Sequence, residues 1–70
     1  MQSTHYRITV AGRLSDTLIA AFDGLSASPS AAGTVLCGDI EDQAALFGVL
    51  ERIESLGLEL LAVCRTEGGR

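Results

Sequence analysis

Three polar residues near the start of the chain, Arg13, Ser15 and Asp16, are spaced to hold a small anion. They lie where a predicted strand passes into a predicted helix. The free backbone N–H groups at the N-terminus of a helix attract anions such as carboxylates, and a neighbouring arginine adds positive charge. The same residues also fit an ordinary helix start, in which the Ser15 hydroxyl caps the helix and Arg13 is exposed. The cap is the commoner arrangement at the start of a helix.

A second polar group, Asp39, Glu41 and Asp42, could recruit a divalent cation through carboxylate oxygens. Their spacing does not match an EF-hand loop, and the helix dipole alone favours acidic residues at a helix start. The only histidine is His5, and no serine, aspartate or cysteine stands at a spacing typical of nucleophilic catalysis with it. We therefore expect no metal site, no cofactor and no catalytic residue, and we expect His5 to be solvated.

The charge of the chain argues against nucleic acid and anionic membranes as partners. The formal net charge is -4, and all 5 basic residues are arginines scattered along the chain. Binding to phosphates or anionic lipids needs several cations on one face. No apolar run approaches the roughly 18 residues of a membrane span, and residues 1–5 lack the features of a signal peptide. We expect a cytoplasmic protein.

The two cysteines, Cys37 and Cys64, fall in predicted strands. They form no CxxC or Cys/His pattern that would hold zinc or exchange disulfides. A free cysteine behaves as a small hydrophobic residue. We therefore expect two buried free thiols in preference to a disulfide.

One small domain must position all of these residues. The chain has 70 residues, of which 47% are hydrophobic, and 1 proline. This composition is typical of a globular domain and not of a disordered segment. A chain this short removes only about 60% of its unfolded surface from water, so residues 1–70 are expected to form a single domain with little stability to spare.

The first half of the chain predicts a strand, a helix and a connection. Apolar and polar residues alternate over residues 6–14, as in a half-buried strand. Ser15 can cap a helix over residues 16–23, and Gly24 fits the position after its end. Residues 26–33 are small and include the only proline, so they predict a connection without a hydrophobic face.

The second half predicts a strand, a helix and a strand. Residues 34–40 form the second strand, and Asp39 or Asp42 caps a helix over residues 42–56 that carries one broad apolar stripe. The third strand covers residues 58–65, and residues 66–70 are too polar to bury, so they predict a frayed tail.

The end of the second helix is predicted at Gly57. A glycine there can adopt the left-handed conformation, which places Leu58 against Ile53 in a Schellman motif.

These elements predict an α+β fold in the order β-α-β-α-β, a two-layer sandwich with two helices on one face of a three-stranded sheet. Right-handed crossovers would make all the strands parallel, but a parallel sheet normally needs cover on both faces. We therefore favour an antiparallel sheet with the first strand in the centre, and residues 26–33 returning along the sheet.

The outer face of this sheet predicts association between copies of the chain. Two helices cover only one face, and the other would carry an apolar patch that is large for a monomer. A homodimer is expected to bury it, with a further protein as a possible partner. The expected interface residues are Thr9, Ala11, Val35, Cys37, Leu61 and Val63.

A second surface on the helix over residues 42–56 competes for the partner role. Phe47 lies at the margin of the apolar stripe, and Gly48 would permit another helix to approach closely. The alternative is that Phe47 wraps the edge of the core.

The second half of the chain, from Thr-Val-Leu-Cys-Gly-Asp-Ile to Leu-Glu-Leu-Leu-Ala-Val, resembles the closing strand-helix-strand of ferredoxin-like and ACT-like domains. Tyr-Arg-Ile-x-Val-x-Gly-Arg-Leu and Asp-Gln-Ala-x-Leu also resemble a group of short, uncharacterised actinobacterial proteins. Relative to the ferredoxin-like pattern, the chain is one strand short between Leu25 and Thr34. The ACT resemblance implies amino-acid binding near the loop after the first strand, where Arg13 lies.

Two functions follow as expectations. The first is a small non-enzymatic module that forms homo-oligomers through the outer sheet face. The alternative is an ACT-like regulatory domain that binds a small anionic metabolite, such as an amino acid, near Arg13, Ser15 and Asp16.

Overall fold

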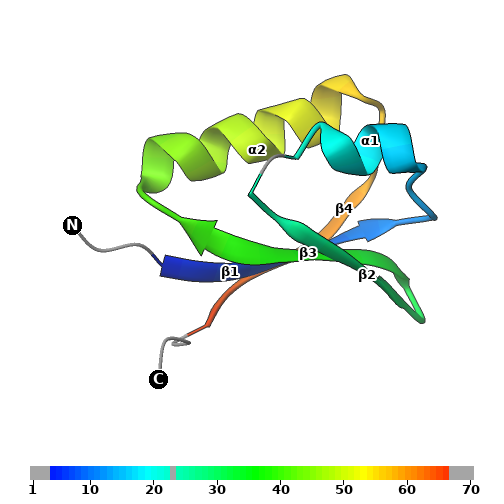
Figure 1. The fold of residues 1–70 in the computed structure, drawn as a ribbon, viewed down its shortest axis with the longest axis horizontal. Coiled ribbons are helices and arrows are strands. Elements are labelled where there is room, and N and C mark those ends of the chain that lie inside the picture. The colour runs from blue at the N-terminus through cyan, green and yellow to red at the C-terminus, as the bar shows by residue number, and fades with distance from the viewer. Residues whose placement is uncertain (1–3, 23, 67–70) are drawn as a thin grey trace.

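The computed structural model describes residues 4–22 and 24–66 of the chain and contains four strands and two helices (Figure 1). In chain order, these elements are β1 (Thr4–Ala11), α1 (Asp16–Ala20), β2 (Ser26–Ser30), β3 (Gly33–Ile40), α2 (Gln43–Ser55) and β4 (Leu60–Thr66).

The strands form one antiparallel sheet in the order β2-β3-β1-β4, and both helices lie on the same face of it (Figure 1). The predicted three-stranded sheet in the order β-α-β-α-β is therefore wrong, because the chain follows the order β-α-β-β-α-β. β1 lies between β3 and β4 and is antiparallel to both, so the parallel alternative is excluded.

The additional strand, β2, occupies the segment predicted as a connection. It forms a hairpin with β3, in which Ser26 pairs with Cys37 and Ser30 pairs with Gly33. β2 is an edge strand that stays mostly exposed, so its pairing requires no apolar alternation. A side chain at Gly33 would overlap the Val10 carbonyl oxygen and place its Cβ 2.7 Å from the Gly12 nitrogen. The hairpin therefore needs glycine where β3 begins.

The core lies between the two middle strands and the helices. Ile8 and Val10 of β1 and Leu36 of β3 are fully buried, and the burial of Ile8 and Val10 agrees with the alternation predicted for residues 6–14. Ile53 of α2 belongs to the same buried cluster. The remaining buried apolar residues of this cluster are Phe22, Ile40 and Leu46.

Local signals fix where the helices begin and end. The Ser15 and Asp42 side chains accept backbone N–H groups at the starts of α1 and α2, so Asp42 and not Asp39 is the second cap. Gly57 has a φ of 78°, and the Leu58 amide donates to the Ile53 carbonyl over 3.1 Å. These contacts confirm the predicted Schellman end of α2.

α1 is shorter than the predicted helix over residues 16–23. After Ala20 the backbone bonds tighten, because the Ala21 amide donates to Leu18 and the Phe22 amide donates to Ile19. Such bonds span three residues instead of four and are typical of a helix that is ending. Asp23 lies outside the described residues.

An irregularity in the ladder between β1 and β4 changes which side chains of β4 share a face. Thr9 pairs with Ala62, but the next residue, Val10, pairs with Leu60. Leu61 is thus the extra residue of a β-bulge on β4. Because paired residues lie on the same face of a sheet, Leu60 lies on the helix side and Ala62 on the outer side.

The end of β4 also differs from the sequence prediction. Thr66 was expected to begin a frayed tail, but it is the last residue of β4 and pairs with His5. Residues 67–70 of the predicted tail lie outside the described residues. No helix in the described part of the chain is long and apolar enough to cross a membrane.

Candidate interaction surface

The three residues predicted to hold an anion do not surround one pocket. The Ser15 hydroxyl is used as a helix cap and accepts the Leu18 amide over 3.3 Å. Arg13 lines a shallow pocket of about 340 Å³ together with Leu14, Ile19 and residues of the β2–β3 hairpin. Ser15 and Asp16 are not among the residues that line it. Arg13 thus lines a pocket that the other two residues do not line.

The acidic residues near the start of α2 have separate partners. The Asp42 carboxylate accepts the Ala45 amide over 2.8 Å, and Asp39 contacts His5 on the neighbouring strand. Glu41 is exposed. Among residues 4–22 and 24–66, no three His, Cys, Asp or Glu side chains are grouped to hold a metal ion.

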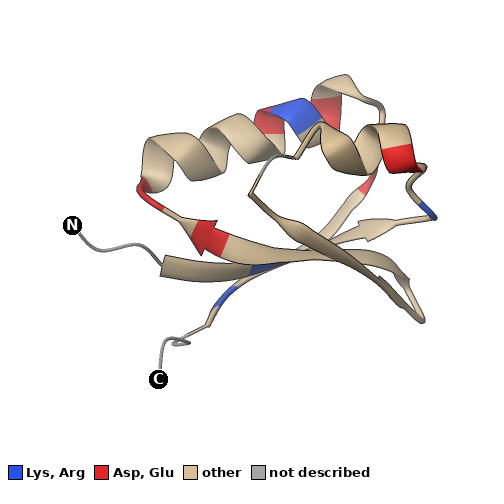
Figure 2. Cartoon of the chain, in the orientation of Figure 1, with Lys and Arg blue, Asp and Glu red and all other residues tan. Residues whose placement is uncertain are grey.

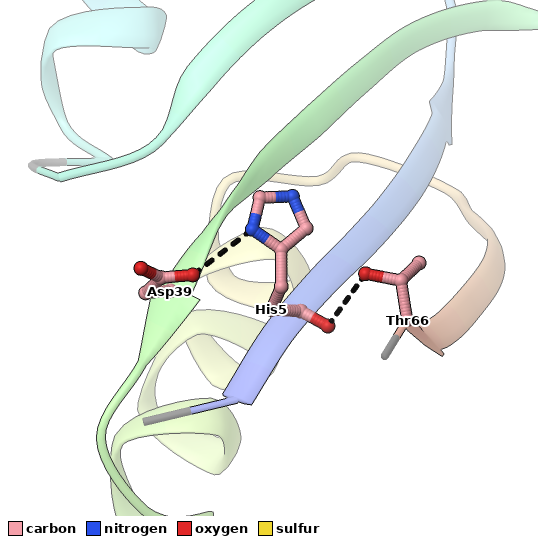
Figure 3. Close-up of polar contacts among 3 residues, drawn as sticks. All are labelled: His5, Asp39 and Thr66. Atoms are coloured by element: carbon pink, nitrogen blue, oxygen red, sulfur yellow. Dashed lines mark hydrogen bonds and ion pairs between the residues drawn. The ribbon is translucent and has the colours of Figure 1, made fainter. Parts of the chain in front are cut away.

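His5 lies on the outer face of the sheet between β3 and β4 (Figure 3). Its Nδ1 atom lies 2.9 Å from Oδ1 of Asp39, and the Thr66 hydroxyl donates to the His5 carbonyl oxygen over 3.2 Å. The Thr66 hydroxyl is therefore directed to the backbone and not to the imidazole ring. His5 was predicted to be solvated, but it contacts Asp39. Both side chains of this contact are exposed. Exposed contacts of this kind add little stability.

Charged residues of both signs are interspersed over the helices and strands (Figure 2). On α2, Arg52 stands between Glu51 and Glu54 and donates from Nη1 to the Ala21 carbonyl over 3.2 Å. This contact connects α2 to the end of α1. It helps to fix how the two helices lie relative to each other.

Four of the predicted interface residues share the outer face of the sheet. Thr9 pairs with Val35, Ala11 pairs with Gly33, and Cys37 pairs with Arg7. Arg7 also pairs with Cys64 on its other side, so a charged side chain stands between the two thiols.

Both cysteines are free, as predicted, but they are not buried, because Cys37 is half-buried and Cys64 is exposed. They lie two strand spacings apart, about 10 Å, which is too far for a disulfide within one chain.

Val63 does not belong to this outer face. It pairs with Ile8, whose side chain points into the core, so Val63 lies on the helix side of the sheet. Leu61 occupies the bulge. The predicted patch of six residues on one face is therefore corrected to four residues, Thr9, Ala11, Val35 and Cys37.

Large exposed apolar side chains gather instead along α2 and β4. Phe47 of α2 is 61% exposed, and Leu60, Leu61 and Val63 of β4 are 42%, 45% and 37% exposed. Phe47 therefore does not wrap the edge of the core. We name these four residues the α2–β4 surface.

A groove of about 460 Å³ runs between the two elements of the α2–β4 surface. Leu50, Ile53 and Leu58 line it together with Phe47 and Leu60, so most of its lining is apolar. Two carboxylates, Glu51 and Glu54, also border it.

Sequence reasoning identified Phe47 but missed Leu60 and the groove. The bulge at Leu61 explains the error for Val63, because simple alternation along β4 puts Leu61 and Val63 together on the outer face, whereas the bulge returns Val63 to the helix side with Leu60.

Residues 5–64 match the model of the protein family described as Domain of unknown function (DUF8691). No curated protein and no solved structure matches the chain.

Proposed function

The chain belongs to the DUF8691 family, and we propose that it is a non-enzymatic interaction module that forms homo-oligomers, most simply a two-fold dimer. The observation that carries this proposal is the α2–β4 surface, where Phe47, Leu60, Leu61 and Val63 are exposed together. Two of these side chains, Phe47 and Leu60, border the same groove, and exposed apolar side chains that lie together mark interaction sites.

The size of the domain favours self-association. The core cluster contains 7 buried apolar residues, Ile8, Val10, Phe22, Leu36, Ile40, Leu46 and Ile53. A core of this size rarely contributes more than about 3–5 kcal/mol of stability, and small domains commonly gain more by forming oligomers.

The polar side chains support a structural role over a catalytic one. The Ser15, Asp42 and Thr66 side chains make hydrogen bonds to the backbone. Such bonds stabilise caps and strand ends. The two free thiols are typical of a reducing compartment such as the cytoplasm.

The structure changes the surface that we propose for association. The outer sheet face carries smaller side chains, including Thr9 and Ala11, together with Arg7 and the contact between His5 and Asp39. The α2–β4 surface carries the larger apolar groups. We therefore place the contact on the α2–β4 surface and not on the outer face expected from the sequence.

Light scattering at micromolar concentration tests the proposal, and we expect twice the mass of one chain. Phe47→Gln should weaken the association, because Phe47 lines the groove. Leu56→Gln is the matched control, since Leu56 is also exposed but lies on the flank of α2 that faces Ala21. The mass of a single chain for the unmodified protein throughout this range would refute the proposal.

A second candidate function is an ACT-like domain that binds a small anionic metabolite. Two observations favour it. The order β-α-β-β-α-β is the ferredoxin-like arrangement, which supports grouping the domain with ferredoxin-like folds. The shallow pocket beside Arg13 offers one cation to an anion. A thermal-shift panel of amino acids and other small carboxylates tests this candidate, because a ligand that binds the folded state raises the melting midpoint.

A further inference from the structure

The pocket beside Arg13 lies between α1 and the β2–β3 hairpin, which stand toward the same end of the molecule (Figure 1). Its volume is about 340 Å³. Binding sites for small molecules range from about 300 to 1,000 Å³, so this pocket suits only a small ligand. Its apolar lining consists of Leu14 and Ile19, which lie before and within α1, and of Ala27 and Pro29 from β2.

The β2 wall of the pocket belongs to the helix side of the sheet. Ala27 pairs with Leu36, which is fully buried, and Pro29 pairs with Thr34, which is 6% exposed. Because paired residues lie on the same face of a sheet, Ala27 and Pro29 both lie on the side that carries α1. The two apolar walls therefore face each other across the pocket.

The polar groups of the pocket reduce to a single cation. Arg13 is the only charged residue among the described residues that line it. The Thr34 hydroxyl donates to the Gly12 carbonyl over 2.9 Å, so its proton is already used. Ser28 pairs with Val35, so its hydroxyl lies on the outer face of the sheet. The described lining thus offers a ligand one guanidinium and no carboxylate.

The backbone beside Arg13 is held in place. Gly12 has a φ of 85°, and its carbonyl accepts the hydroxyl of Thr34 in β3. α1 begins three residues after Arg13. Within residues 4–22 and 24–66 the one ion pair joins His5 to Asp39, so no carboxylate in this part of the chain neutralises Arg13.

We propose that this pocket binds a small monocarboxylate with an apolar body, and not an amino acid. Arg13 pairs with the carboxylate, and a branched alkyl chain or a phenyl ring of the ligand lies between Ile19 and Ala27. A guanidinium makes charge-assisted hydrogen bonds to a carboxylate, frequently two at once, and the apolar body is favoured by its removal from water. This inference rests on the second candidate function, metabolite binding, and specifies the chemical class of the ligand.

An α-ammonium group opposes binding in this pocket. In an amino acid, the ammonium is attached to the carbon next to the carboxylate, so a carboxylate bound to Arg13 brings it close to the guanidinium. Like charges repel each other, and the described lining contains no carboxylate to offset the repulsion. An ammonium that leaves water without an acceptor also loses its hydration. Isocaproate, which is leucine without the amino group, should therefore bind more tightly than leucine.

Thermal-shift measurements with matched probes test the ligand class. The probes are isocaproate, leucine, isocaproamide and acetate, compared at equal concentration and ionic strength. We expect isocaproate to raise the melting midpoint, because it binds the folded state. Leucine should leave the midpoint nearly unchanged because of its ammonium, isocaproamide because it lacks the negative charge, and acetate because it lacks the apolar body.

Two substitutions with matched controls place the binding in this pocket. Arg13→Gln should raise the dissociation constant of isocaproate at least about tenfold, as expected for a lost charge-assisted hydrogen bond. Arg7→Gln should not, since Arg7 is an exposed arginine on the outer sheet face. Pro29→Glu adds a carboxylate to the wall and should abolish binding, whereas Ser26→Glu should not, because Ser26 is exposed on β2 and is not among the described lining residues. Circular dichroism confirms that each variant is folded.

The outcomes separate this inference from metabolite binding in general. A shift with leucine as large as that with isocaproate would overturn the inference and leave the second candidate function intact. An equal shift with isocaproamide or acetate would overturn it, because the charge or the apolar body would not be recognised. Isocaproate binding that survives both Arg13→Gln and Pro29→Glu would place the ligand elsewhere and overturn it as well. An unchanged midpoint with both isocaproate and leucine would count against this inference and the second candidate together.

Discussion

Ile8 and Val63 pair directly across β1 and β4 on the same face of the sheet, yet Ile8 is fully buried and Val63 is 37% exposed. The helices therefore cover β1 much better than β4. Because of this asymmetry, the apolar side chains on the helix side of β4 stay exposed to solvent in a single chain.

The first prediction concerns this pair. Ile8→Val removes one methyl group from the core and should cost about 0.5–1.5 kcal/mol. Val63→Ala removes two methyl groups but should cost no more than about 0.5 kcal/mol in a single chain, because exposed substitutions rarely cost more. Urea unfolding at a protein concentration too low for association measures both. If Val63→Ala proves more costly than Ile8→Val at that concentration, Val63 is buried within one chain and the description of β4 is wrong.

The second prediction contrasts two glycines. A Cβ at Gly38 would lie 2.6 Å from Cδ2 of Leu25 and 2.8 Å from the Gly24 carbonyl oxygen, whereas a Cβ at Gly48 would meet nothing within 4 Å. Gly38→Ala should therefore cost about 1–3 kcal/mol through overpacking. Gly48→Ala should stabilise the chain by about 1 kcal/mol through helix propensity. Thermal unfolding, monitored by circular dichroism, shows whether each substitution lowers or raises the stability of the chain. A loss of association in Gly48→Ala would instead show that a partner helix contacts Gly48.

The third prediction concerns the cap of α2. Asp42→Ala should cost about 0.5–2 kcal/mol, because the Ala45 amide loses its acceptor. Glu41→Ala is the control, since Glu41 is an exposed acidic residue directly before the cap. Chemical denaturation of both variants separates the hydrogen bond from the loss of one negative charge. Equal costs for the two variants would contradict the capping role.

The fourth prediction tests the metabolite candidate. If an anion binds in the pocket beside Arg13, Arg13→Ala should reduce the ligand-induced rise in melting midpoint. The same substitution should change the unliganded protein by no more than about 0.5 kcal/mol. Arg7→Ala is the matched control, because Arg7 is an exposed arginine on the outer sheet face. If no small carboxylate shifts the midpoint of the unmodified protein, this candidate fails.

Features set by short-range interactions could be predicted from the sequence. The Ser15 cap involves residues only three apart, and Gly57 ends α2 through bonds from Gly57 and Leu58 to residues within the same turn. The alternation that buries Ile8 and Val10 also needs only the local pattern of β1. Each of these signals has one physical cause, and that cause lies within a few residues.

Features set by distant partners could not be predicted in this way. β2 lacks an apolar face, and what makes it a strand is its ladder with β3. The faces of Leu60 and Val63 depend on a bulge that exists only in relation to β1. The sequence pattern therefore placed Val63 on the outer face, because alternation assumes an uninterrupted strand. Arg13 and Ser15 are only two residues apart in sequence but have different surroundings, since the pocket beside Arg13 needs the β2–β3 hairpin.

Because β1 lies in the middle of the sheet, its two edges are paired at different times during translation. β1 is synthesised before both of its neighbours, β3 and β4, and β4 is synthesised after β3 and α2. The nascent chain can close the β1–β3 ladder early, while the other edge of β1 stays open until residues 60–66 emerge. Pairing between segments so distant in sequence is slow because loop closure must precede it. During that interval the edge of β1 that will later pair with β4 is unpaired, and unpaired strand edges are prone to aggregate. A chaperone that covered this edge would protect the nascent chain from aggregation.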